Sequence, residues 1–427
     1  FLTKMMRLLF FCSALLVWQG LTPTNAAFLV KKLTVQNTLY HSQLFHENIQ
    51  TPYRGLHRKT IFDTKLNAEQ DNAPQSPLPK PSIAIVGSGA VGSYYGARLW
   101  EGQNYVVKFH MRGDHYQQSI KGGLNVTSID GDIYIPPSKL MAYEHTEEIG
   151  PVDWVIVALK SSSLEAIPPL ILPLLTKTTR VLVIMNGLVE DDLLSMLRDA
   201  LSSSSSKEDE LCCGAVYGGM ALICSNRLSP GRIDHSYAGL LTGGVAATSS
   251  KGGVFDPSHK EAFELLWKDT KQPIAFEPIL LRGRWMKNMW NLPFNTISVA
   301  MGGITVDKIV TDPGLRSLAF TIMDETIAIA NADLAFHGHS DKNENNNSSS
   351  PSIWLNEQDK EKMMAFTDIM GPYKTSTMLD LTNRRAMEVK YLFRKPLERA
   401  KALNVPAPHL ETLVLQVEAM QRFYNLF

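Results

Sequence analysis

Ser82-Ile83-Ala84-Ile85-Val86-Gly87-Ser88-Gly89-Ala90-Val91-Gly92 is the stretch that decides the fold. Its first five residues form an apolar, partly β-branched run that predicts a buried strand, and residues 93–100 after it predict a helix. Gly87 permits the tight turn between them, Gly89 lets a ligand approach the backbone, and Gly92 lets helix and strand pack closely. The N-terminus of the helix offers free N–H groups to phosphates. The stretch therefore predicts a Rossmann-type dinucleotide-binding domain.

The next predicted strand, Val106–Met111, ends in Arg112. An acidic residue is usual at this place in NAD-binding chains, whereas an arginine suits the 2′-phosphate of NADP(H). Arg112 therefore favours NADPH as the cofactor. Asp114, two residues further on, keeps NAD as the alternative.

Polar residues follow two further predicted strands. Lys160 comes directly after the apolar run 154–159, and Asn186 follows the run 181–185. Because ligands of open α/β sheets bind beyond the carboxyl ends of the strands, we expect both side chains to meet the cofactor. Residues 214–226 and 232–242 then predict two strands joined by a short turn, a hairpin that closes the sheet.

From Ile279 onward helical patterns replace strand patterns. In the predicted helix 283–300, Lys287, Asn291 and Asn295 recur every four residues and therefore lie on one face. Their neighbours are largely apolar, and polar groups buried without partners are costly. We expect this row to face a ligand, with a solvated helix face as the alternative.

These motifs together resemble the ketopantoate reductase (2-dehydropantoate 2-reductase) family, from about residue 81 to the C-terminus. The resemblance lies in the glycine loop and in the motifs Leu159-Lys160, Asn186-Gly187, Lys287-x-x-x-Asn291-x-x-x-Asn295, Ser376-x-x-x-Asp380 and Met387-Glu388. The segment 290–295 resembles a divergent branch of the family, and Val389-Lys390 replaces a usual Ile-Asp pair. The resemblance implies an α/β protein with a Rossmann-type domain followed by an all-α domain.

The resemblance also implies roles for individual residues. Lys287 resembles the family's catalytic lysine. Four residues resemble those that bind substrate: Asn186, Asn291, Asn295 and Ser376. Besides the glycine loop, four residues resemble those on the NADPH side of the site: Arg112, Lys160, Asn186 and Glu388. No metal is implied.

The implied activity is the NADPH-dependent reduction of 2-dehydropantoate to pantoate, a step of pantothenate biosynthesis. A ketone that accepts a hydride gains negative charge on its oxygen, so a cation beside that oxygen stabilises the transition state. Three alternatives stay open: a reductase of another 2-keto acid, a non-catalytic NADP(H)-binding protein, and a secreted glycoprotein with sequons at Asn125 and Asn346.

The composition limits the classes of partner that the protein is expected to bind. In the 427 residues, 42 Lys and Arg balance 42 Asp and Glu, which gives no electrostatic case for binding nucleic acid or an anionic membrane. Four irregularly spaced cysteines form no zinc or redox pair. We expect a small 2-keto acid as the partner, no permanent membrane span, and a monomer or homodimer.

The N-terminal region predicts targeting. An apolar run at 8–18 with small residues at 24–26 is typical of a signal peptide, and the basic stretch after it resembles a transit peptide. Together they resemble the two-part leader of algae with complex plastids, which predicts a plastid location; the cytoplasm or another organelle is the alternative. The predicted organisation is thus a leader and linker (1–80), an NADP-binding domain (81–277) and a helical substrate domain (278–427).

Overall fold

The computed structural model describes residues 80–202, 211–249, 253–340 and 352–426. The predicted leader lies outside these ranges, apart from Lys80, and so does the sequon at Asn346. Within them, no helix combines the length and the apolar character that crossing a membrane requires.

The first part of the fold is a ten-stranded sheet. Five of its strands run parallel in the order β7-β6-β1-β2-β5: β7 (Arg180–Ile184), β6 (Trp154–Val157), β1 (Ser82–Val86), β2 (Val106–His110) and β5 (Met141–Tyr143). The middle strands are buried on both faces, which explains their continuous apolar sequence. Helices accompany this sheet: α3 (Ala90–Glu101), α4 (Gly113–Gly122), α5 (Ile167–Ile171), α6 (Glu190–Ser202) and α7 (Pro257–Leu266).

The predicted hairpin is confirmed, but it does not close the sheet. Its strands β8 (Ala215–Ser229) and β9 (Arg232–Thr248) are antiparallel and much longer than the parallel strands. The start of β8 pairs with β7, whereas the start of β9 pairs with β3 (Leu124–Ser128). β4 (Ile133–Ile135) then extends the sheet beyond β3, and β10 (Ile274–Phe276) pairs with the other part of β9. The hairpin therefore lies inside a mixed sheet and joins two groups of strands.

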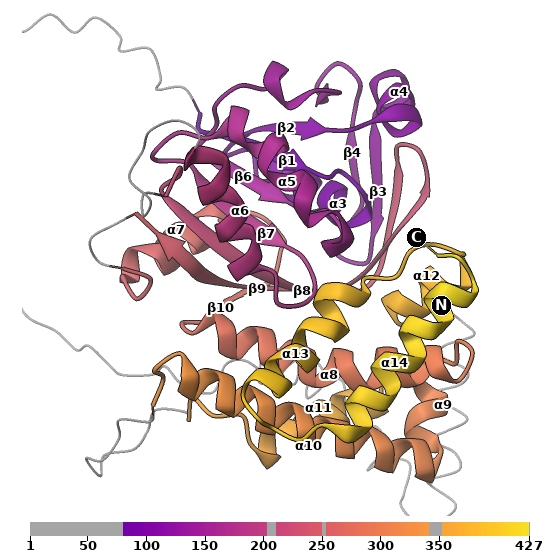
Figure 1. The fold of residues 1–427 in the computed structure, drawn as a ribbon. Coiled ribbons are helices and arrows are strands. Elements are labelled where there is room, and N and C mark those ends of the chain that lie inside the picture. Colours follow the sequence, from indigo (N-terminus) through magenta and orange to yellow (C-terminus); the bar gives the residue numbers. More distant parts are fainter. Residues whose placement is uncertain (1–79, 203–210, 250–252, 341–351, 427) are drawn as a thin grey trace, which may run out of the picture. The chain divides into compact units, whose positions relative to one another are not determined.

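The second part of the fold contains only helices among the described residues. Figure 1 shows them packed around one another. They are α8 (Leu280–Ala300), α9 (Val306–Thr311), α10 (Pro313–Phe336), α11 (Glu357–Asp368), α12 (Ser376–Thr382), α13 (Lys395–Ala402) and α14 (Pro408–Phe423). α8 is largely buried, and its fully buried Trp285 donates its indole N–H to Asp333 on α10 (2.8 Å). The expected α/β fold with an all-α C-terminal part is confirmed.

The C-terminal ends of β1, β2, β6 and β7 lie along one edge of the parallel sheet, because parallel strands share their direction. The glycine loop follows β1 at this edge. Arg112, Lys160 and Asn186 each come two or three residues after the end of their strand. Four elements distant in sequence thus bring the predicted cofactor residues to the same edge, as ligand sites in such sheets require.

Candidate active site

The loop between β1 and α3 has the geometry of a phosphate site. Gly87 has a positive φ of 89°, and a Cβ on Gly92 would lie 2.3 Å from the Gly87 carbonyl oxygen, so neither position tolerates a side chain. A Cβ on Gly89, in contrast, would meet no atom within 4 Å. Gly89 is the N-cap of α3 and no side chain caps this helix, so its first N–H groups remain available to a ligand. These residues fit a dinucleotide pyrophosphate.

The other loop residues face the protein. Ser88 is buried, its backbone N–H donates to the carbonyl of His110 at the end of β2, and its own carbonyl accepts from the Ser93 hydroxyl (3.0 Å). The Ala90 carbonyl accepts from Ser225 on β8 (3.3 Å). Val91 packs against the core beneath the sheet. Ser88, Ala90 and Val91 therefore shape the loop through their contacts within the protein.

Arg112 and Lys160 occupy different surroundings at this edge. Arg112 is exposed and forms the N-cap of α4. Lys160 lies after β6, and its ammonium contacts the Asp380 carboxylate of α12 at 2.6 Å. The Asp380 side chain is buried, whereas the Lys160 side chain is half-exposed. Lys160 thus joins the sheet to the helical part, a connection that the sequence did not predict.

A hydrogen-bonded chain links the sheet edge to Lys287. Glu388 accepts from the backbone N–H and hydroxyl of Ser161 (2.7 and 2.9 Å), and its other oxygen accepts from the Asn186 amide (3.2 Å). The Asn186 oxygen in turn accepts from the Lys287 ammonium at 2.9 Å. The structure therefore brings Asn186, Glu388 and Lys287 together. The position of Glu388 beside Asn186 is consistent with an orienting function.

Lys287 is held by groups that leave part of its ammonium unused. Besides Asn186, its Nζ contacts the carbonyl oxygen of Ala221 on β8 at 2.9 Å. An ammonium has three N–H donors, so one remains for a ligand. Burial, with a smaller contribution from the neighbouring Arg284 guanidinium, lowers the pKa of Lys287 to about 7, while Glu388 acts in the opposite direction. A lysine with such a pKa exchanges a proton readily near neutral pH.

The two asparagines on the Lys287 face of α8 are both buried, but only one has an unused donor. Asn295 donates to the backbone and side-chain oxygens of Asn291 (3.0 and 3.3 Å) and accepts from the Thr377 N–H (3.2 Å). The Asn291 amide nitrogen is buried and has no partner among the described residues. Because an unpaired buried donor is costly, Asn291 fits a ligand oxygen. Asn295 positions Asn291 and the start of α12, where the exposed Ser376 lies.

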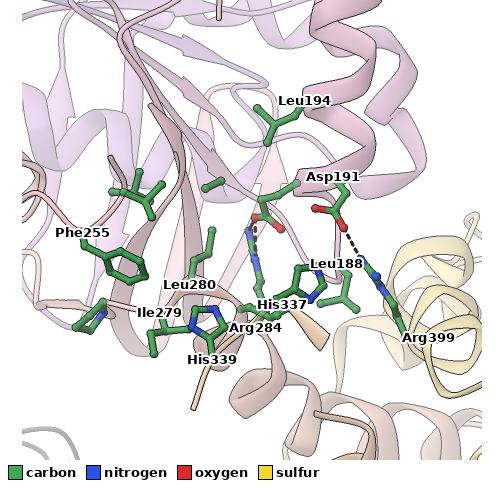
Figure 2. Close-up of a pocket in the computed structure, with 16 residues that line it drawn as sticks. Leu188, Asp191, Leu194, Phe255, Ile279, Leu280, Arg284, His337, His339 and Arg399 are labelled. Atoms are coloured by element: carbon green, nitrogen blue, oxygen red, sulfur yellow. Dashed lines mark hydrogen bonds and ion pairs between the residues drawn. The ribbon is translucent and has the colours of Figure 1, made fainter. Parts of the chain in front are cut away.

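Arg284 anchors α8, and the sequence did not reveal this role. Its guanidinium is 2% exposed and forms an ion pair with Glu190 at the start of α6. It also donates to the carbonyl oxygens of Met185 (2.6 Å) and Gly219 (3.3 Å), at the end of β7 and on β8. Figure 2 shows Arg284 at this junction, beside the ion pair between Asp191 and Arg399. Lys287 follows Arg284 by one turn, so this anchor fixes the height of Lys287 above the sheet.

The cavity of about 190 Å³ in Figure 2 lies apart from Lys287 and the glycine loop. Arg284 of α8 lines the cavity, but none of the residues that the sequence predicted for the site does. The cavity therefore adds nothing to the hydrogen-bonded chain described above.

A second backbone contact holds the turn that carries Asn186. The Leu188 N–H donates to the Tyr391 carbonyl at 3.2 Å, and a Cβ on Gly187 would lie 2.2 Å from the same oxygen. Tyr391 belongs to a π-helical segment, Lys390–Arg394, in which N–H groups bond to carbonyls five residues earlier. The residue five positions after Tyr391 is Pro396, which has no N–H. Because Pro396 cannot donate to the Tyr391 carbonyl, this carbonyl accepts from the Leu188 N–H in the turn at Gly187 instead.

Fold and site together define a class. A glycine loop suited to a dinucleotide lies at the edge of a Rossmann-type sheet, and a lysine of lowered pKa reaches the same edge from a helical second part. These are the parts of a two-domain dehydrogenase or reductase that works with a nicotinamide cofactor.

The comparisons with known proteins specify this class. Residues 83–247 match the family described as ketopantoate reductase PanE/ApbA, and residues 280–421 match its C-terminal counterpart. The 2-dehydropantoate 2-reductase of Nostoc sp. is 30% identical over 78% of this chain and 93% of its own length. The chain belongs to the ketopantoate reductase family and is an oxidoreductase acting on a CH–OH group.

Solved structures agree with this assignment. The crystal structure of 2-dehydropantoate 2-reductase from Geobacter metallireducens is 30% identical, with a TM-score of 0.65 over 79% of this chain and 99% of that one. A D-mandelate dehydrogenase solved with NADH and anilino(oxo)acetate shares the fold at 19% identity, with a TM-score of 0.64 over 81% of this chain and 100% of that one.

Proposed function

We propose that the chain reduces 2-dehydropantoate to pantoate with NADPH. The observation that carries this proposal is the Lys287 ammonium, held by Asn186 and Ala221 with a donor to spare, opposite a glycine loop suited to a dinucleotide. The names of the relatives support the substrate. The product is the pantoate unit that pantothenate biosynthesis requires.

Bound NADPH supplies a hydride to the ketone carbon, and the residues of this chain manage the charge that results. Lys287 lies where its ammonium can contact the carbonyl oxygen and donate a proton to it as the C–O bond becomes single. Its unprotonated amine then stays hydrogen-bonded to Asn186. Asn291 offers its unpaired amide to a second substrate oxygen. Glu388 and Ser161 keep Asn186 in the orientation that receives Lys287.

The function is tested by assaying the purified chain with NADPH against 2-dehydropantoate, 3-methyl-2-oxobutanoate, pyruvate and 2-oxoglutarate. We expect the highest kcat/KM with 2-dehydropantoate. Growth of a bacterial pantoate auxotroph on expression of the chain supplies an independent readout. Turnover of another keto acid with none of 2-dehydropantoate would refute the substrate, and binding of NADPH without any turnover would refute the enzyme.

The NADPH preference is tested at Arg112. We expect Arg112→Asp to raise the KM for NADPH by roughly 10- to 100-fold, which corresponds to the loss of a charge-assisted hydrogen bond, and to change the KM for NADH much less. The matched control is Arg198→Asp. Arg198 is also exposed, but it lies near the C-terminal end of α6, which runs away from the sheet edge that carries the glycine loop. An unchanged ratio between the two cofactors in Arg112→Asp would contradict the assignment.

A further inference from the structure

A pair of tyrosines forms a contact between the sheet and the helical part. Tyr237 lies on β9, and Tyr373 lies in the segment just before α12; their ring centroids are 6.3 Å apart. Trp290 of α8 contacts Tyr373 edge-on, with ring centroids 5.9 Å apart. The Trp290 indole donates to Thr367 of α11 at 3.1 Å, which fixes its ring. Tyr373 thus contacts both a ring from the sheet and a ring anchored in the helical part.

The contacts of β8 place this pair beside the candidate active site. Tyr237 pairs in register with Cys224 on β8. Three residues before Cys224, the Ala221 carbonyl accepts from Lys287, and one residue after it, Ser225 donates to the glycine loop. Successive residues of a strand rise about 3.3 Å, so Ala221 and Ser225 are about 13 Å apart. The backbone of Tyr237 therefore lies level with the part of β8 between the lysine contact and the contact to the phosphate loop.

Residues of the helical part also place the tyrosine pair beside the candidate active site. Trp290 immediately precedes Asn291, and Tyr373 comes three residues before Ser376, at the helix start that Asn295 holds through Thr377. The polar row of α8 and the aromatic rings thus lie next to each other along α8 and at the start of α12.

The hydroxyls of the two tyrosines offer hydrogen-bond donors. Among the described residues, neither hydroxyl has a hydrogen-bond partner, although both side chains are partly buried. Burial raises the pKa of both phenols, so both remain protonated donors at neutral pH. A contact that only joined the two parts would need no hydroxyls, whereas a partly buried phenol without a partner can donate to a ligand.

We propose that Tyr237 and Tyr373 form the subsite for the substituent of the 2-keto acid, with their rings against a branched carbon next to the carbonyl and a phenol bonded to a hydroxyl one carbon further on. This inference rests on the proposed function and narrows its substrate class. 2-Dehydropantoate has this pattern, since its carbonyl is followed by a carbon with two methyl groups and a hydroxymethyl group. The polar row of α8 offers no apolar surface for those methyl groups, whereas the rings do.

The test separates the ring from the hydroxyl in the full-length chain. We expect Tyr373→Phe or Tyr237→Phe to lower kcat/KM for 2-dehydropantoate about 3- to 10-fold, as for an uncharged hydrogen bond, and to leave 3-methyl-2-oxobutanoate, which lacks the hydroxyl, unchanged. Tyr373→Ala should lower kcat/KM for both branched acids about 10- to 100-fold relative to pyruvate. Tyr424→Phe, at a tyrosine of α14's end that is 49% exposed, is the matched control and should change nothing.

The outcomes are distinguishable from failure of the proposed function. If the wild-type chain does not reduce 2-dehydropantoate, that function fails, and the subsite is judged on the ratio of 3-methyl-2-oxobutanoate to pyruvate alone. If Tyr373→Ala leaves the ratio of kcat/KM for 3-methyl-2-oxobutanoate to kcat/KM for pyruvate unchanged, the subsite is overturned. It is also overturned if both phenylalanine variants treat the hydroxylated and unhydroxylated acids alike, or if the variants change the KM for NADPH instead, since the rings would then serve the cofactor.

Discussion

Lys287→Ala is expected to lower kcat with 2-dehydropantoate by about 10²- to 10⁴-fold, the usual contribution of a positioned acid. The glycine loop and Arg112 lie on the sheet part and do not contact Lys287, so the affinity for NADPH, measured by fluorescence titration, should change little. Lys308→Ala is the matched control, because Lys308 is an exposed lysine on the neighbouring helix α9. A fall of less than about tenfold would mean that Lys287 is not the proton donor.

The pH dependence gives the same assignment a second readout. In the proposed mechanism reduction requires the protonated ammonium, and burial together with Arg284 lowers the pKa of Lys287 to about 7. The protonated fraction therefore falls as pH rises through 7, and kcat for reduction should fall with it. Lys287→Arg keeps its charge in this range and should remove this limb from the residual activity. A profile that is the same in the wild type and the arginine variant would assign the titration to another group.

Arg284→Ala is expected to cost about 3–5 kcal/mol in the free energy of unfolding, the cost typical of breaking a buried ion pair. The substitution leaves the Glu190 carboxylate without its partner and removes the donors of the Met185 and Gly219 carbonyls. Urea denaturation followed by circular dichroism measures the change. Arg422→Ala is the matched control, since Arg422 is 62% exposed and lies 4.0 Å from Glu418; it should cost less than about 1 kcal/mol.

A double variant separates the lost charge balance from lost packing. Arg284→Met combined with Glu190→Met removes both charges and keeps apolar volume, so it should recover part of the stability lost in Arg284→Ala. If Arg284→Ala costs as little as the Arg422→Ala control, the ion pair does not anchor α8. If the double variant is no more stable than Arg284→Ala, the unpaired Glu190 carboxylate does not cause the loss, and the missing contacts to the Met185 and Gly219 carbonyls do.

The sequence was sufficient for those parts of the site that depend on local pattern. The glycine loop, the residues after each strand and the four-residue spacing on α8 are local, and the structure brings Asn186, Lys287 and Asn291 to one place. Their roles in binding and catalysis stay predictions. What the spacing did not show was that Asn295 has its hydrogen bonds within the protein, because its partner Thr377 lies 82 residues away.

Pairings across the fold were beyond the sequence. Arg284 and Glu190 are 94 residues apart, and Lys160 and Asp380 are 220 residues apart, so no periodicity relates them. The place of the hairpin in the sheet was also missed. Its length allowed one half to pair with β7 and the other with β3, and strand patterns report which residues are buried but not which strand lies beside which.

The contact between the turn at Gly187 and the π-helical segment has a consequence for how this protein can evolve. The partner of that turn is a main-chain carbonyl, which every residue type supplies, so position 391 can change its side chain without losing the contact. Position 187 has no such freedom, since any Cβ there meets that oxygen. Position 396 is constrained as well, because a residue with an N–H there would compete for the same carbonyl. Sequence drift at this boundary should therefore preserve a glycine and a proline that lie outside the reaction itself, whereas this contact sets no requirement on the side chain at position 391.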